Sequence, residues 1–563
     1  MKLDIVIVTY NSEHWMRNCI NAIEKQKDIK LSDITLIVVD NNSTDKTIQT
    51  LEYLKKNSKI GNFIIENTGE NLGFGKSNNY GFEKGKSEYV LFLNPDTELE
   101  EDALNEAFKN IKNSEKEFAM WEFRQKPYEH PKWYDIRTGE TSWSSGACFI
   151  IKRDVFKEVG GFDKRIFMYA EDVDLSWNVR LHGYKIKYVP KSTVVHYCYK
   201  TAGEVKPVQY FNSVINNLNL RLKYGSKQEI RDWFTQFKAI MTKQGPFEGS
   251  RKGLLRAYLK NLKHTFYYLN WRKQKDIKEK FKDFKPIFLG FDYEGIRDGA
   301  FLANENIKEN PLVSIIIRTC GRPNVLRETL NSLKNQTYKN IEIVVVEDGK
   351  NVSEQMIKTE FNDINIVYKA TGEKQGRCKV GNIGLETAKG KYLNFLDDDD
   401  LFYADHVETL VKELVKHPDY KLAYSLAYES KIEVQETEPE YKYKEVSKSL
   451  PLVKKFSRIT LLTRNAFPIQ AVMFEKDIFL KYGGLDEELD NLEDWEMWAR
   501  YAQENKFLYV PKVTSVYRVP AKQQDYDSRK ELLDSYYKKA QEKIFARNVV
   551  VKPEDLLEEI KYI

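Results

Sequence analysis

The same ordered series of short motifs occurs twice in this 563-residue chain, and it constrains the fold more than any other feature of the sequence. Each copy opens with an apolar run that ends in a turn, residues 5–8 in the first and 313–317 in the second. A stretch of helical spacing follows. A second apolar run then ends in acids, at Asp40 in the first copy and at Glu347 and Asp348 in the second. Strand, helix and strand in this order is the βαβ pattern.

The later motifs also keep their order in both copies. Segments rich in glycine and asparagine, 71–96 and 375–400, each pass through a helical stretch into a strand that ends in carboxylates. A Gly-Gly turn then precedes a Glu-Asp pair, at 171–172 in the first copy and 493–494 in the second. A duplicated fold by itself explains the strands and the glycine turns. It does not explain why acids recur at strand ends, where unpaired like charges repel each other.

Length and composition set the remaining bounds. A chain of 563 residues is expected to form at least two domains, and 41% hydrophobic with 31% charged residues is typical of a soluble globular protein. A net charge of +5 does not imply a nucleic-acid partner. Five cysteines without CxxC spacing fit reduced thiols in the cytoplasm and argue against zinc. The amino-terminal apolar run is expected to be a buried strand and not a signal peptide, and we find no apolar run long enough to span a bilayer.

Acids placed directly after strand-like runs predict a binding site. In open α/β sheets, ligands settle outside the carboxyl ends of the strands. The four aspartates at 397–400 would repel each other without a cation, so we expect Mg²⁺ or Mn²⁺ shared with a diphosphate. The alternative is a solvated loop or a helix cap. The first copy has Asn94-Pro95-Asp96 at this place, which predicts a weaker or differently completed metal site, with His196 as a further ligand.

The Glu-Asp pairs each open a helical segment, and this position suits a catalytic base. A carboxylate at a helix amino terminus is stabilised as the anion. Such an anion, Asp172 or Asp494, can accept a proton from an attacking hydroxyl within hydrogen-bond reach. Plain capping of the helix is the alternative.

Taken together, these motifs resemble the inverting family 2 glycosyltransferases of the GT-A fold, over residues of about 1–200 and 311–520. The resemblance implies an α/β fold of two tandem GT-A domains with Rossmann-like mixed sheets. It implies Asp172 and Asp494 as the bases and Asp96, Asp397, Asp399 and His196 as the metal ligands. The residues expected to bind the nucleotide sugar are Thr9, Asn11, Asp40 and Asn78 in the first module, and Thr319, Arg322, Glu347, Asp348, Arg377, Asn382 and Asp398 in the second.

The two modules resemble different branches of the family. The first, with NLGFGKSNNYG, NPD, EDVDL and VVHY, is similar to bacterial rhamnosyltransferases that use dTDP-rhamnose. The second, with DDDD, GRCKVGN and EDWEMW, is similar to polysaccharide-assembly enzymes that use UDP-hexoses. It departs from the family at Glu347, where aspartate is usual, at Arg318-Thr319-Cys320, where Pro-Thr-Tyr is common, and at Tyr517, near which there is no histidine.

The remaining segments are expected to be helical, so that four parts follow one another: a first GT-A domain at 1–204, a basic linker at 205–310, a second GT-A domain at 311–520 and a tail at 521–563. The basic, aromatic linker either touches anionic lipid or bridges the modules with its apolar side. The tail is expected to pack back or to mediate self-association, and the oligomeric state is left open.

We therefore expect a bifunctional enzyme that acts at the cytoplasmic face of a bacterial membrane and adds sugars from dTDP or UDP donors to a lipid-linked saccharide. One alternative is an active module beside a degenerate module that binds glycan or acts as a scaffold. A protein that binds nucleotide sugars without catalysis is another. The sequence leaves the sugars and linkages open, because the loops that shape the pocket vary within such a fold.

Overall fold

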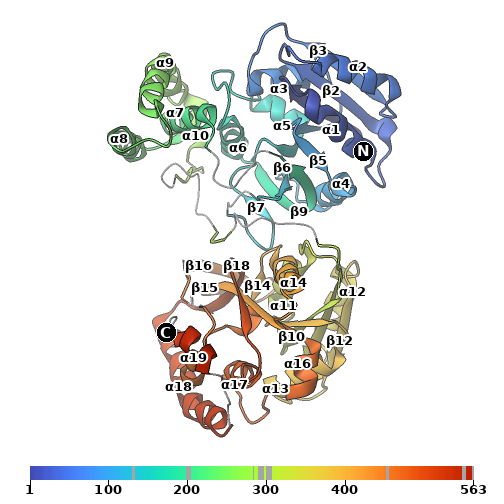
Figure 1. The fold of residues 1–563 in the computed structure, drawn as a ribbon, viewed down its shortest axis with the longest axis vertical. Coiled ribbons are helices and arrows are strands. Elements are labelled where there is room, and N and C mark those ends of the chain that lie inside the picture. Colours follow the sequence, from blue (N-terminus) through green and yellow to red (C-terminus); the bar gives the residue numbers. More distant parts are fainter. Residues whose placement is uncertain are drawn as a thin grey trace. The chain divides into compact units, whose positions relative to one another are not determined.

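The computed structural model divides the chain into two compact units, Met1–Arg297 and Asp298–Ile563, each with its own mixed sheet (Figure 1). It describes residues 1–129, 133–197, 205–282, 284–288, 297–299, 307–451, 455–547 and 553–560. The predicted domain boundary at residue 204 lies outside these ranges, and those at 310 and 520 stay predictions. In the described part of the chain, no helix combines the length and the apolar character needed to cross a membrane.

The first unit is built on a sheet with the strand order β3-β2-β1-β4-β8-β6-β9-β5, and β7 pairs with β9. Strands β1 to β4 are parallel, as the βαβ pattern predicts, whereas β8 runs antiparallel to β4. The strands are β1 (Leu3–Thr9), β2 (Ile34–Asp40), β3 (Asn62–Asn67), β4 (Tyr89–Leu93), β5 (Thr97–Leu99), β6 (Phe118–Lys126), β7 (Glu140–Thr141), β8 (Cys148–Lys152) and β9 (Lys185–His196).

Helices cover both faces of this sheet. Successive side chains of a strand point to opposite faces, so Ile5 and Ile7 join one core cluster while Val6 and Val8 join another. The helices are α1 (Glu13–Glu24), α2 (Thr47–Asn57), α3 (Phe74–Phe82), α4 (Ala103–Asn113), α5 (Arg153–Glu158), α6 (Glu171–Leu181), α7 (Pro207–Tyr224), α8 (Lys227–Thr242), α9 (Ser250–Trp271) and α10 (Lys275–Lys280), with a 3₁₀ turn at Leu31–Asp33.

The helical region after the first sheet packs on α6. The rings of Trp177 in α6 and Tyr224 in α7 meet edge to face with centroids 5.5 Å apart. Beside them Lys223 Nζ lies 2.7 Å from Asp174 Oδ1, and both groups are buried. Since a buried ion pair is stable only when both charges stay partnered, α7 is an integral part of the first unit, and α9 packs on α7 in turn.

The main path of the second sheet repeats that of the first, in the order β12-β11-β10-β13-β17-β15-β18-β14. The added strand differs, because β16 pairs with β15, which corresponds to β6, whereas β7 pairs with β9. Parallel β10, β11, β12 and β13 take the places of β1, β2, β3 and β4. The strands are β10 (Val313–Thr319), β11 (Ile341–Glu347), β12 (Ile366–Ala370), β13 (Tyr392–Phe395), β14 (Leu401–Phe402), β15 (Leu422–Glu436), β16 (Lys442–Ser449), β17 (Val472–Glu475) and β18 (Phe507–Pro520). The predicted fold class, two tandem Rossmann-like domains with mixed sheets, is confirmed.

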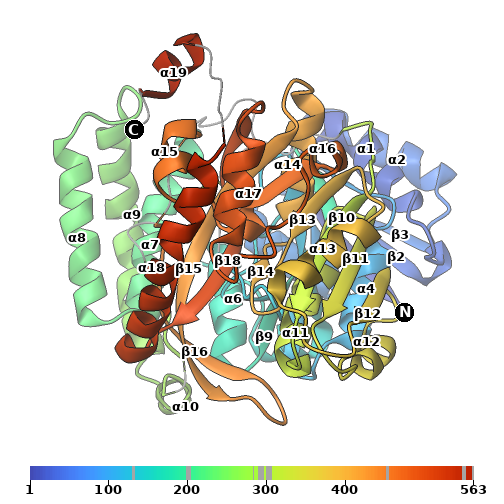
Figure 2. The ribbon, with the colours of Figure 1, turned by 90° about the horizontal axis from the view of Figure 1, so that it is seen from below.

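The tail helix α18 packs against α15 and α17 of the same unit (Figure 2). Its Tyr537 stacks on Trp495 with ring centroids 5.1 Å apart, and its Lys543 Nζ lies 2.6 Å from Asp486 Oδ2. The helices of the second unit are α11 (Pro323–Lys334), α12 (Glu354–Glu360), α13 (Arg377–Thr387), α14 (His406–Lys416), α15 (Arg458–Thr463), α16 (Lys476–Tyr482), α17 (Glu493–Tyr501), α18 (Gln523–Phe545) and α19 (Pro553–Glu559), with a 3₁₀ turn at Ile469–Ala471.

Candidate active site

In the first unit, the side chains expected at the nucleotide lie together at the carboxyl ends of β1 and β2. Thr9 and Asp40 are register partners on these strands, and Thr9 Oγ1 donates a 2.8 Å hydrogen bond to Asp40 Oδ1. Asp40 also accepts from the backbone N–H of Ser43 at 2.8 Å. Asn11 sits in the facing turn with φ of 51°, and its Oδ1 accepts from the N–H of Thr44 at 2.8 Å. The two turns are thus tied to each other.

Asn78 does not share this arrangement. It is buried within α3, and its Nδ2 donates to the carbonyl of Phe74, one turn earlier in the same helix, at 3.1 Å. The next residue, Asn79, reaches out of the helix instead. Its side chain donates to the carbonyl of Phe162 at 2.8 Å and accepts from the Phe162 N–H at 3.0 Å, just after the Gly-Gly turn.

In the second unit, Asn382 makes the same pair of bonds with Leu485, at 3.0 and 2.8 Å. Asn79 is therefore the counterpart of Asn382, and its role was missed in the sequence. Both residues come six positions after a glycine with positive φ, Gly73 or Gly376, and this spacing was the signal. The shared role is to hold the Gly-Gly turn; nucleotide contacts of Asn78 and Asn382 stay predictions.

Asp96 and His196 meet at the edge of the first sheet. Asp96 precedes β5, whose Thr97 is the register partner of His196 on β9. The His196 Nε2 lies 3.5 Å from Asp96 Oδ1, and Nδ1 is 2.7 Å from Gln125 Oε1. Burial raises the pKa of Asp96, but the hydrogen bond and charge of His196 outweigh it, so the pKa lies below the usual range. One oxygen and one nitrogen donor therefore stand together, a set that suits Mn²⁺. Gln125, near the carboxyl end of β6, carries no sequence signal for this role.

Asp172 lies near the Asn94-Pro95-Asp96 motif. Its Oδ2 accepts from the N–H of Gly146 at 2.8 Å, and the carbonyl of the next residue, Ala147, accepts from the N–H of Asn94 at 2.9 Å. Asp172 is the second residue of α6, which follows Ala170 in the left-handed conformation with φ of 70°. The expected base and the expected metal motif are thus brought to the same end of the sheet.

Beside Asp172, the first unit leaves two buried acceptors without a described partner. Glu171 Oε2 and Asn94 Oδ1 are both fully shielded, and no described group bonds to either. Burial, together with the charge of Asp172, raises the pKa of Glu171 well above its usual range. A carboxyl of this kind favours its neutral form.

The second unit differs at its nucleotide end, because a glutamate replaces Asp40. The longer side chain of Glu347 reaches the following turn, where it accepts from the N–H groups of Val352 and Ser353 at 3.2 and 3.1 Å. In the first unit Thr9 donates to Asp40. Its counterpart Thr319 donates instead to Asp398 Oδ2, at 2.7 Å. The next acid, Asp348, accepts from the N–H groups of residues 375 and 376 at 2.6 and 3.1 Å and so holds the glycine loop.

Two arginines pair with the first three aspartates of the run in the second unit. Arg318 donates to both carboxylate oxygens of Asp397, at 2.9 Å each. Arg322 pairs with Asp398 and lies 3.5 Å from Asp399 Oδ2. The expectation that these acids repel each other in the absence of a metal overlooked both guanidinium groups. Among the described residues, no three histidine, cysteine or acidic side chains are grouped to hold a metal ion.

The charges of the aspartate run differ as a result. Burial raises the pKa of Asp397, but Arg318 outweighs it and the pKa is lowered. Burial and the charge of Asp399 raise the pKa of Asp398 to about 6, although Arg322 lowers it in part. Asp399 is the most exposed of the three. Of the expected metal ligands, Asp399 is therefore the one best placed to meet a cation.

Arg318 also connects the aspartate run to the expected base. Its Nη1 donates to Glu493 Oε1 at 2.8 Å, and the half-exposed Arg377 reaches the same oxygen at 3.7 Å. The neighbour of Glu493 is Asp494, whose Oδ2 accepts from Asn465 Nδ2 at 2.8 Å. Burial and the charge of Glu493 raise the pKa of Asp494 to about 7. Such a group is half-ionised near neutral pH, as suits a general base.

Comparisons with known proteins agree with the duplication. The family model described as "Glycosyl transferase family 2" matches residues 4–174 and 314–474, one stretch in each unit. An uncharacterized glycosyltransferase of Methanocaldococcus jannaschii is 30% identical over 240 residues, which are 41% of this chain and 78% of that protein. One from Rickettsia prowazekii is 28% identical over 219 residues, 38% of this chain and 66% of that protein.

Solved structures give weaker likenesses. The structure of residues 1–349 of TarS from S. aureus in complex with UDP matches 50% of this chain and 89% of that chain, with 18% identity and a TM-score of 0.34. The mannosyltransferase PcManGT from Pyrobaculum calidifontis, in complex with GDP-Man and Mn²⁺, matches 50% of this chain and 73% of that chain, with 16% identity and a TM-score of 0.33.

Proposed function

The chain belongs to glycosyl transferase family 2, with the family's domain present twice, and from this premise we propose that each module transfers a sugar from a nucleotide diphosphate to an acceptor hydroxyl. The observation that supports this most is the placement of an aspartate at the start of α6 and of α17, beside the acids that follow β4 and β13. A base and a diphosphate site at one edge of a sheet are the two parts that a single displacement needs.

In this mechanism Asp172 and Asp494 each take the proton from the acceptor hydroxyl as its oxygen attacks the anomeric carbon. The bond from that carbon to the diphosphate breaks, and the configuration inverts. Asn79 and Asn382 keep the Gly-Gly turns, and with them the base helices, in position. A divalent cation, when bound, would neutralise the charge that grows on the leaving diphosphate. Asp96 and His196 would hold it in the first module.

In the second module the donor set fits a cation less well. Both oxygens of Asp397 are engaged by Arg318, so Asp399 would be the main ligand. We propose that Arg322 and Arg377 contribute positive charge toward the diphosphate there, since guanidinium groups bind phosphate oxygens strongly. The second module is accordingly expected to depend less on the metal than the first.

For the substrates we propose dTDP-rhamnose as the donor of the first module and a UDP-hexose as that of the second. The acceptor is a lipid-linked saccharide at the cytoplasmic face of the membrane, and the product is part of a bacterial surface glycan. No nucleic acid takes part. These assignments come from the NLGFGKSNNYG and DDDD motifs.

A matched pair of variants tests the proposal. Asp172→Asn and Asp494→Asn keep the size of each side chain and remove the base. With purified donors and a lipid-linked acceptor, each variant is expected to lose a different product bond, by a factor of about 10² to 10⁴. Thermal shift with each sugar nucleotide, with Mn²⁺ and with chelator, identifies the donors independently of the acceptor.

A second candidate is supported by the Arg318 bridge, which engages Asp397 and Glu493 within the protein. In that case the second module only binds glycan or positions a partner. Loss of both bonds in Asp172→Asn, with no effect of Asp494→Asn on any product, would favour this candidate over two active modules.

A further inference from the structure

Helix α9 carries an apolar stripe that faces solvent. Its members are Leu255, Leu259, Leu262 and Phe266, which are 44%, 57%, 42% and 77% exposed. Their spacing of four, three and four residues keeps them within a sector of about 60° around the helix, since each residue turns the helix by about 100°. Isolated exposed apolar residues are ordinary, but a row along one helix face marks an interaction surface.

The stripe is not the core side of α9. A different face of the helix, with Leu254 and Tyr268, is buried against α7. Asn261 on that face exchanges two hydrogen bonds with Asn219 of α7, at 3.0 and 2.8 Å. Gly253 lies so close to Phe211 of α7 that an added Cβ would meet its ring at 2.4 Å. These contacts set the rotation of α9, so the stripe cannot turn inward.

Positive charge borders the stripe. Lys252, Arg256, Lys260 and Lys263 follow it on one side around the helix, Arg251 lies on the other side, and all five are exposed. The helix contains no aspartate or glutamate. Residues 207–282 hold 17 Lys and Arg against five Asp and Glu, whereas the excess over the whole chain is five. The positive charge of this protein is therefore concentrated around α9.

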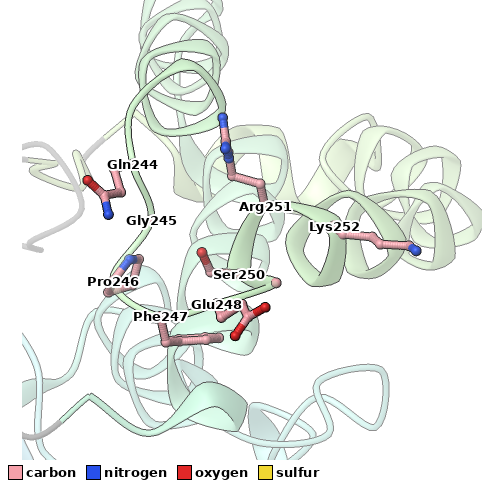
Figure 3. A pocket seen from close by; sticks show the side chains of 9 residues that line it. Gln244, Gly245, Pro246, Phe247, Glu248, Ser250, Arg251 and Lys252 are labelled. Atoms are coloured by element: carbon pink, nitrogen blue, oxygen red, sulfur yellow. The ribbon is translucent and has the colours of Figure 1, made fainter.

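A hollow lies at the start of α9. It encloses about 530 Å³ within the loop that joins α8 to α9. The side chains of Arg251 and Lys252 point away from the loop in different directions, and those of Phe247 and Glu248 lie close to each other (Figure 3). Cations thus stand at the amino-terminal end of the stripe as well as along its side.

We propose that this face of α9 binds the surface of a membrane that contains anionic lipid. A helix with an apolar sector bordered by lysine and arginine lies in the interface, with its apolar side among the acyl chains and its charges at the headgroups. The 22 residues of α9 span about 33 Å. A helix of this length can lie along the membrane surface with all four stripe residues inserted at the same time. The long side chains of lysine and arginine can extend back to the headgroups.

This inference extends the proposed function, which places the acceptor on a lipid, but its test needs neither donor nor acceptor. The full chain is floated with phosphatidylcholine vesicles that contain either no phosphatidylglycerol or about a third of it. We expect binding to the anionic vesicles that weakens with added salt. Equal binding to both vesicles, or no binding to either, would overturn the proposal.

Two variants separate the apolar and the charged contributions. Leu259→Asp with Phe266→Asp should reduce binding to anionic vesicles at least tenfold. Arg256→Gln, Lys260→Gln and Lys263→Gln together should reduce it by up to about 100-fold, at about fivefold for each charge. Leu480→Asp, in the exposed part of α16 in the second unit, is the matched control and should bind as the wild type.

The same variants distinguish the other possible occupant, a second copy of this chain. Light scattering that shows a dimer broken by Leu259→Asp with Phe266→Asp would assign the stripe to self-association and overturn the lipid proposal. Hydrolysis of donor sugar in solution should be unchanged in all three variants. If the wild type transfers no sugar from purified donors to a lipid-linked acceptor while vesicle binding remains, the proposed function fails and this inference stands.

Discussion

The difference between the two units at Arg318 leads to a prediction about stability. The strand registers place Val8 of the first unit where Arg318 stands in the second, and Asn94 where Asp397 stands. Replacing Arg318 by valine therefore copies a residue that the fold already accepts at this position. In the second unit, however, it leaves Asp397 and Glu493 without their shared guanidinium.

The size of the effect follows from burial. Arg318 and Glu493 are only 7% and 4% exposed, and their nitrogen and oxygen are 2.8 Å apart. Removing one partner of such a pair costs about 3–5 kcal/mol, because the remaining charge is buried and has lost its nearest partner. For a unit of this size, 1 kcal/mol corresponds to about 2 °C in melting temperature. We therefore expect the second unit of Arg318→Val to melt about 6–10 °C lower.

A second substitution tests whether charge is the cause. Adding Asp397→Asn copies Asn94 and removes one of the two carboxylates that lost Arg318, so the double variant should recover about 1–2 kcal/mol of the loss. The loss should also shrink as the pH falls. An unpaired buried carboxyl favours its protonated form, as the raised pKa of Glu171 shows, and protonation in the folded state stabilises it toward acid pH.

Calorimetry of the full chain measures this effect, with the transition of the first unit as the internal reference. The control is Arg327→Val, which breaks an ion pair with Glu360 whose side chains are 32% and 43% exposed. Such a pair contributes under about 1 kcal/mol, so the control should melt within about 2 °C of the wild type. If Arg318→Val melts no lower than this control, or if the double variant is less stable than the single, the reasoning is wrong.

Three further predictions concern the site and the pH response. In an Asp172→Asn background, the kcat/KM of the second module should fall about tenfold for each pH unit below about 7, because Asp494 acts as a base only when it is ionised. A pH profile of kcat/KM that is flat down to pH 5 would exclude Asp494 as the base. His196→Ala should weaken Mn²⁺ binding to the first unit by at least tenfold in titration calorimetry, while His14→Ala should leave it unchanged. Burial lowers the pKa of His406 to about 3, so between pH 7 and pH 5 this residue binds a proton only in the unfolded state. In urea titrations, the change in unfolding free energy of the second unit from pH 7 to pH 5 should therefore be about 2 kcal/mol less favourable in the wild type than in His406→Gln.

Local sequence patterns determined the architecture of this protein. Apolar runs of strand length, glycine turns and helical spacing are properties of neighbouring residues, so the two βαβ units and the repeat were predictable from them. The same patterns placed Asp40 and Glu347 at strand ends and Asp172 and Asp494 at helix starts, because each position depends only on where its own element begins or ends.

Only the tertiary structure decided which charges meet. Arg318 and Glu493 are 175 residues apart in the sequence. Their contact depends on how the strands of the second sheet are ordered and on where α17 packs against that sheet. The sequence displayed four aspartates and suggested a metal, whereas Arg318 of β10 and Arg322 of the following turn already pair with the first three of them. Likewise, the exposed stripe of α9 looks in sequence like a core face, because α9 has apolar residues on two sides. Packing against α7 selects one of these sides and leaves the other to solvent.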